Sequence, residues 1–195
     1  MVYRDIELAR YADSRIHFTG ITSPVSLDHI RRAKAEGLQV SCSVAPHHLF
    51  FTDSDLMGYD TNLKVSPPLR PMADVELLRK AVLDGTIDCF ASHHLPQESD
   101  VKNVEFEYAA PGMIGLETYY AALRTAMPEL SDDRLIQMLS HNPRKIFGLE
   151  PVAIEKGQPA ALTFYQSDEM VRVTPDFFRS LSRNSPFIGK ELKGK

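Results

Sequence analysis

RIHFTGITSPVSLDHIRRAKAEGLQVSCSV, residues 15 to 44, carries the pattern that decides the fold. Its opening, 15–21, is apolar and β-branched, which predicts a short buried strand. Ser23 and Pro24 then suit the N-cap and the first position of a helix. The stretch closes on a second predicted strand at 38–44. A strand, a helix and a strand in this order predict a parallel β-α-β unit.

The same alternation continues along the chain, with further strands expected at 62–65 and 87–91. Further helices are expected at 72–83, 115–127 and 132–139. The sequence therefore predicts an α/β protein with a parallel sheet. Beyond residue 150 the pattern changes to two strand-like stretches, 161–165 and 171–173, and an end rich in Ser, Asn, Pro and Gly.

Composition narrows the class of protein. The chain has 195 residues, 43% of them hydrophobic and 25% charged, which excludes global disorder. A net charge of -4 argues against nucleic acid as the main partner. No apolar run approaches the roughly 18 residues that a membrane span needs. Two cysteines, Cys42 and Cys89, form neither a disulfide framework nor a zinc knuckle, so we expect a reducing, cytoplasmic setting.

Candidate chemistry lies at the carboxyl ends of the predicted strands, where parallel α/β folds gather functional groups. Four of the seven histidines fall there as two pairs, 47–48 and 93–94. Neutral imidazole is the commonest metal ligand, so a metal site is one interpretation. A purely structural role is the other. His17, inside a predicted strand, is better explained as a core or interface residue.

Six segments at these positions resemble the dihydroorotases, cyclic amidohydrolases of pyrimidine synthesis. The segments cover nearly the whole chain: VAPHHLF (44–50), LKVSPPLR (63–70), DCFASHHLPQ (88–97), GMIGLET (112–118), NPRKIFGL (142–149) and NSPFIG (184–189).

The resemblance implies a fold and a missing part. It implies strands five to eight of a metal-dependent (β/α)8 TIM barrel over 1–150, and the C-terminal segment of a small β-rich domain over 151–195. The first-strand His-x-His pair and the fourth-strand lysine of the family, which bind zinc, have no counterpart. We therefore expect a fragment of a longer protein, or a half that pairs with another barrel half or forms a homo-oligomer.

The resemblance also assigns roles to individual residues. It makes His48 the sixth-strand metal ligand. It places His93 where the family has an aspartate that binds metal and shuttles the catalytic proton. Gly20 stands where a fifth-strand histidine ligand is expected. For the substrate, it implies Ser66 in place of an asparagine and Gln97 in place of a histidine.

Gly112 completes the implied substrate-binding set. Four departures around one site predict weakened hydrolysis, and three hypotheses follow. The first is a zinc-dependent enzyme that hydrolyses dihydroorotate reversibly to N-carbamoyl-L-aspartate. The second is a non-catalytic dihydroorotase-like scaffold for aspartate transcarbamoylase. The third is a cyclic amidohydrolase that acts on another ring substrate.

Overall fold

The computed structural model describes the whole chain, residues 1–195, and its centre is a three-stranded parallel sheet. The strands are β1 (Ile16–Phe18), β2 (Val40–Val44) and β3 (Cys89–Phe90), in that spatial order. Register places Ile16 beside Val40, and Ser43 beside Cys89. The predicted parallel β-α-β unit over residues 15 to 44 is confirmed.

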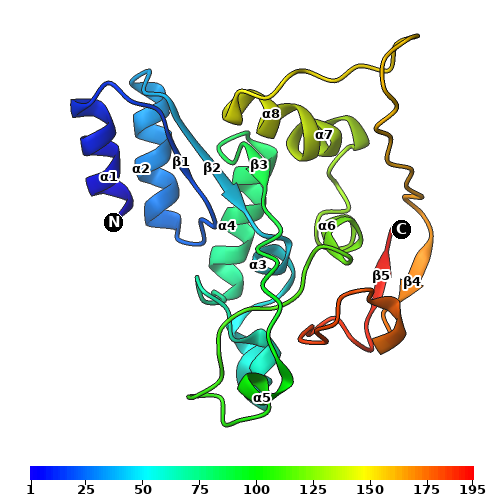
Figure 1. Cartoon of the computed structure of the whole chain (residues 1–195). Helices are drawn as coiled ribbons and strands as arrows, with labels where there is room; N and C mark the ends of the chain where they lie inside the picture. The colour runs from blue at the N-terminus through cyan, green and yellow to red at the C-terminus, as the bar shows by residue number, and fades with distance from the viewer.

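The helices form where apolar residues recur at helical spacing. Figure 1 shows α1 and α2 beside β1 and β2, with α4 and α6 nearer the middle of the molecule. The predicted helix at 72–83 is confirmed at the same bounds. The helices are α1 (Val2–Tyr11), α2 (Pro24–Ala35), α3 (Pro46–Phe50), α4 (Met72–Leu83), α5 (Ser99–Lys102), α6 (Tyr119–Ala126), α7 (Asp132–Ile136) and α8 (Asn142–Phe147), with a π-helical turn, η3 (Gln137–His141), between the last two. None of them is both long and apolar enough to cross a membrane.

One predicted barrel strand is absent, so the sheet has three strands where four, the fifth to the eighth, were expected. The segment 62–65 overlaps a 3-10 turn, η2 (Thr61–Leu63), instead of a strand. The Asp60 carboxylate accepts a hydrogen bond from the backbone N–H of Asn62 and starts this turn. The prolines that follow lack the N–H groups that a central strand needs.

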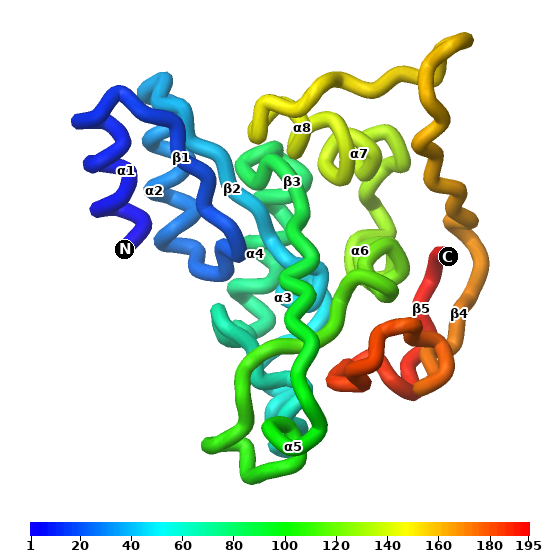
Figure 2. The backbone as a smooth tube through the Cα atoms, in the orientation of Figure 1, coloured from blue at the N-terminus to red at the C-terminus, as the bar shows by residue number.

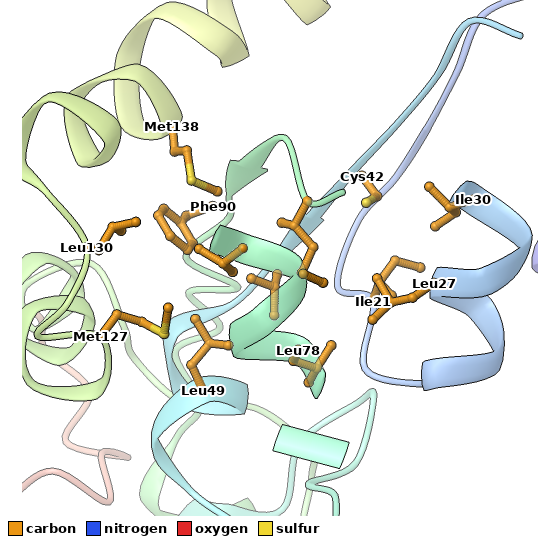
Figure 3. Packing of buried hydrophobic residues seen from close by; sticks show 14 of the residues in the cluster. Ile21, Leu27, Ile30, Cys42, Leu49, Leu78, Phe90, Met127, Leu130 and Met138 are labelled. Carbon is orange, nitrogen blue, oxygen red and sulfur yellow. The ribbon is translucent and has the colours of Figure 1, made fainter. Parts of the chain in front are cut away.

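The sheet separates an apolar layer from a polar one. Along β2, Val40, Cys42 and Val44 belong to a core of 20 buried residues between the sheet and its helices. Figure 3 shows part of that core, in which Ile30 comes from α2, Leu78 from α4 and Met138 from η3. The alternate residues of β2, Ser41 and Ser43, point to the opposite face because side chains alternate along a strand.

The C-terminal segment departs from its prediction. Residues 161–165 form no strand, and Figure 2 shows the chain after α8 as an extended tube on the outside of the molecule. The strand expected at 171–173 is confirmed in outline as β4 (Met170–Arg172). Its antiparallel partner β5 (Glu191–Lys193) was not predicted, because three residues with two charges carry no strand signal of their own.

Two further 3-10 turns complete the elements, η1 (Asp53–Gly58) and η4 (Pro175–Phe177). A second core of 11 buried residues joins the C-terminal segment to the loops at the strand ends. Phe187 lies in it against Phe50 and Phe51, with ring centroids 5.1 and 4.9 Å away. This packing places the end of the chain beside the histidine-bearing loops.

Candidate functional site

Three imidazoles meet at the carboxyl edge of the sheet. His47 and His48 begin α3 directly after β2, and His93 follows β3. The ring centroids of His47 and His48 are 4.2 Å apart, and that of His93 lies 6.2 Å and 6.4 Å from them. Neighbouring parallel strands bring their carboxyl ends together, which is why His48 and His93, 45 positions apart in sequence, lie in contact range.

All three rings are held neutral. Burial lowers the pKa of His47 well below its usual range, and the nearby rings lower it further. Burial lowers the pKa of His48 to about 4, against a smaller opposing effect of the Pro67 carbonyl. The pKa of His93 is also lowered by burial. These three side chains therefore carry no positive charge at neutral pH.

His48 is fixed by one backbone contact. Its Nε2 lies 2.8 Å from the carbonyl oxygen of Pro67. A carbonyl only accepts, so Nε2 carries the proton and donates. Nδ1 is buried without a hydrogen-bond partner. The ring is thus positioned by the proline segment rather than by a neighbouring side chain.

His93 fills the space that a side chain at position 20 would need. A Cβ built on Gly20 would lie 2.3 Å from Cε1 of His93 and 3.0 Å from its Nε2. Both residues have left-handed backbones, with φ of +69° at Gly20 and +46° at His93. The ring is held there by Thr19, whose Oγ1 lies 3.0 Å from Nε2 of His93.

The predicted substrate residues are divided between two pockets. Ser66, Gly112 and His93 line a pocket of about 230 Å3, together with His47 and His94. The remaining lining residues are Val65, Leu95 and Pro111. His94 is positioned by its Nδ1, which accepts a hydrogen bond from the backbone N–H of Gly115, 3.1 Å away.

Gln97 lies outside that pocket. It lines a separate, more open pocket with Asn184, and its side-chain amide donates to the carbonyl of Pro111 at 3.0 Å. His48 lines neither pocket and has 1% of its surface exposed. The structure therefore brings Ser66, Gly112 and His93 to one pocket and places His48 beside His47 and His93. Gln97 alone is set apart.

Several residues of the site were not anticipated. Thr19 and Ser43 join the site through hydroxyl groups, and His17 reaches Ser43 with its Nε2 at 3.2 Å. The sequence signals these three residues only by the alternation of polar and apolar residues along the two strands that carry them. Lys102 is also structural here, because its ammonium donates to the carbonyls of Thr61, Ala110 and Gly112, the last of which lines the pocket.

The residues present do not fit the zinc that the resemblance implies. No group of three or more His, Cys, Asp or Glu side chains converges as metal ligands require. Gly20 offers no donor, and the Nε2 atoms of His48 and His93 are engaged in hydrogen bonds, which leaves only Nδ1 of each ring. No carboxylate is placed among the three imidazoles to offset a dication.

Comparison with known proteins gives first a class and then a family. No family model matches the chain. The structure of L-hydantoinase (dihydropyrimidinase) from Arthrobacter aurescens superposes with a TM-score of 0.92 at 28% identity, over 99% of this chain and 45% of that one. The fold and the histidine-bearing strand ends thus define part of a cyclic amidohydrolase.

The sequence relatives name the family. The dihydroorotase of Desulforapulum autotrophicum is 41% identical over 197 residues, which cover 100% of this chain and 46% of that protein. The chain is similar to dihydroorotases over its whole length, and it spans about half the length of the curated relatives it matches. The inactive dihydroorotase-like domain of a Chaetomium thermophilum CAD-like multifunctional protein superposes with a TM-score of 0.72 at 27% identity, over 97% of this chain and 50% of that one.

Proposed function

We propose that this chain is the C-terminal half of the barrel of a dihydroorotase-like protein of pyrimidine biosynthesis, and that it does not assemble the hydrolytic metal centre. The observation that carries the proposal is the His93 ring lying in the space of a position-20 side chain. An expected ligand is absent there, and the His93 ring uses its Nε2 in a hydrogen bond to Thr19. The family reaction, reversible hydrolysis of dihydroorotate to N-carbamoyl-L-aspartate, is therefore expected to be impaired.

Metal content and turnover test this proposal on the protein purified from its source cells with zinc supplied. We expect well below one zinc per copy and no dihydroorotate hydrolysis. A curated dihydroorotase purified in parallel is the positive control. One zinc per copy, with hydrolysis that is lost in His93→Ala, would show that the centre is intact and would refute the proposal.

A second candidate function is a non-catalytic scaffold for aspartate transcarbamoylase. It is favoured by the likeness to an inactive dihydroorotase-like domain within a multifunctional protein. We expect the protein to form a stable complex with the transcarbamoylase of the same cell, measured by analytical ultracentrifugation of the two purified proteins. Separate sedimentation at micromolar concentrations would exclude this role.

A third candidate is hydrolysis of another cyclic amide, which the likeness to an L-hydantoinase supports. Ser66 and Gly112 line the 230 Å3 pocket that would receive the ring. Incubation with a panel of hydantoins and dihydropyrimidines is the test. Because the residues present do not fit zinc, we expect no turnover, and turnover of any member would replace the first proposal by this one.

A further inference from the structure

One carboxamide of the C-terminal segment contacts two residues of the pocket wall. Asn184 is buried, with 5% of its surface exposed. Its Nδ2 donates to the carbonyl oxygen of Leu95 at 3.0 Å and to that of Gly112 at 3.2 Å. Both of these residues line the 230 Å3 pocket. The Oδ1 of Asn184 accepts a hydrogen bond from the backbone N–H of Gln97 at 3.3 Å. A single side chain thus joins the loop after β3 to the loop that contains Gly112.

The surroundings of Asn184 suit a carboxamide and no other side chain of its size. A carboxamide carries two N–H donors on one end and an acceptor oxygen on the other. The donor end faces two carbonyls and the oxygen faces an N–H, which determines the orientation of the group. Aspartate would place an anion against the two carbonyls, and leucine would supply neither donor nor acceptor.

Gly112 has no backbone group left for a ligand. Its N–H donates to the carbonyl of Lys64 at 2.8 Å. Its carbonyl oxygen accepts from Nζ of Lys102 at 3.1 Å as well as from Asn184, which uses both lone pairs. Gly112 therefore contributes shape to the pocket and no polar group. That shape depends on its closeness to Leu95, because a Cβ on Gly112 would lie 2.6 Å from Cδ2 of Leu95.

The segment that carries Asn184 is held on both sides of it. Before Asn184, the carboxylate of Glu117 accepts hydrogen bonds from the backbone N–H groups of residues 179 and 180. After it, Phe187 is 2% exposed and packs in the second core. The backbone carbonyl of Asn184 also accepts a hydrogen bond from the N–H of Ile114 at 3.0 Å. The position of the carboxamide is therefore determined before it contacts the pocket wall.

We propose that Asn184 is a positioning residue of the pocket, and that the C-terminal segment sets the separation of Leu95 and Gly112 through its carboxamide. The carbonyls of Leu95, Pro111 and Gly112 all accept hydrogen bonds from side chains that do not line the pocket. A ligand therefore meets this wall as an aliphatic surface, which suits the apolar edge of a ring. The inference deepens the proposed function and rests on it in one respect, that this pocket would receive the ring.

The test is the NMR spectrum of the full chain labelled with carbon-13 and nitrogen-15. In the unmodified protein we expect a nuclear Overhauser effect between the Leu95 methyl groups and the α-hydrogens of Gly112. Asn184→Leu removes the donors and the acceptor at similar size. We expect it to abolish this Overhauser effect and to shift the carbonyl carbons of Leu95 and Gly112 upfield. The Leu95 amide, which donates to the Met113 carbonyl at 2.8 Å, should exchange roughly 30-fold faster, from two lost hydrogen bonds of about 1 kcal/mol each.

Two control variants separate the carboxamide from general loosening. Asn103→Leu makes the same chemical change at an exposed asparagine. Val173→Ala weakens the second core, to which the C-terminal segment contributes, without changing the carboxamide. Both are expected to leave the Overhauser effect and the two carbonyl shifts unchanged. Asn184→Ala replaces Asn184→Leu if the latter does not fold.

Three results would overturn the inference: no Overhauser effect between Leu95 and Gly112 in the unmodified protein, unchanged signals in the Asn184 variant, or equal changes in Val173→Ala. The first of these needs no variant to fold. Zinc content and hydrolysis are measured separately. A negative NMR result therefore refutes the positioning role alone, whereas stoichiometric zinc with turnover refutes the proposed function.

Discussion

Gly20→Ala offers the sharpest test of how the site is built, because the cost has two separable parts. The first is the left-handed backbone at φ +69°, which costs a residue with a Cβ about 1–2 kcal/mol. The second is the contact of 2.3 Å between the new Cβ and Cε1 of His93. The ring must move, which breaks its hydrogen bond to the exposed Thr19 hydroxyl, a loss of about 1 kcal/mol.

Gly37→Ala is the matched control. Gly37 is also left-handed, with φ +82°, and a Cβ there would meet nothing within 4 Å. It therefore carries the backbone cost alone. We expect Gly20→Ala to lower the free energy of unfolding by roughly 1 kcal/mol more than Gly37→Ala does, from the lost hydrogen bond between His93 and Thr19.

Urea unfolding of the full chain measures this difference, and the double variant Gly20→Ala, His93→Ala separates its causes. Removing the ring should remove the contact, so the added cost of Gly20→Ala should disappear in the His93→Ala background. Equal losses for Gly20→Ala and Gly37→Ala would refute the reasoning. So would an undiminished cost of Gly20→Ala when His93 is already alanine.

Three further predictions concern the surroundings of the pocket. Lys102→Met leaves three carbonyls without their ammonium donor. We expect a loss of roughly 3 kcal/mol in the free energy of unfolding and faster amide exchange over 103–112. Unchanged exchange would count against this role of Lys102. Gly112→Ala combines φ +125° with a Cβ 2.6 Å from Cδ2 of Leu95, and thermal unfolding should show a loss of roughly 2 kcal/mol, which an unchanged midpoint would contradict. His48 has its pKa lowered from 6.5 to about 4 by burial, so the unfolded chain takes up a proton that the folded chain does not as pH falls below 6.5. Between about pH 7 and about pH 5, unfolding with a chelator present should become easier by about 2 kcal/mol from this group, and His48→Gln should flatten that dependence.

Local patterns determined most of the elements that could be predicted. The helix Met72–Leu83 was predictable because its apolar residues recur at helical spacing. The strand signal over 15–21 was sufficient for β1 because the neighbouring strand supplies a partner. The segment 62–65 has similar residues but no partner, and its prolines cannot complete a ladder. Strand formation depends on pairing, which a short window of sequence does not contain.

The site could be predicted only in part, for a related reason. Histidines at strand ends mark His47, His48 and His93 as neighbours, and the three rings do meet. The sequence does not contain the direction in which a ring points. The contact of His93 with Thr19, 74 residues away, depends on a left-handed backbone that histidine adopts only when its surroundings hold it there.

Gly20 and His93 are therefore two parts of one change to the site. A Cβ at position 20 and the His93 ring in its present place exclude each other, since they would be 2.3 Å apart. A histidine placed at position 20 must displace the His93 ring, and an aspartate placed at position 93 leaves Thr19 without its imidazole partner, whereas Ser43 keeps His17. Either substitution made alone therefore disturbs the contact between His93 and Thr19, and only the second substitution could compensate for it. We therefore expect recovery of a metal centre in this chain only from Gly20→His and His93→Asp together. The polar face of the sheet around these positions is neutral and hydrogen-bonded without those two side chains.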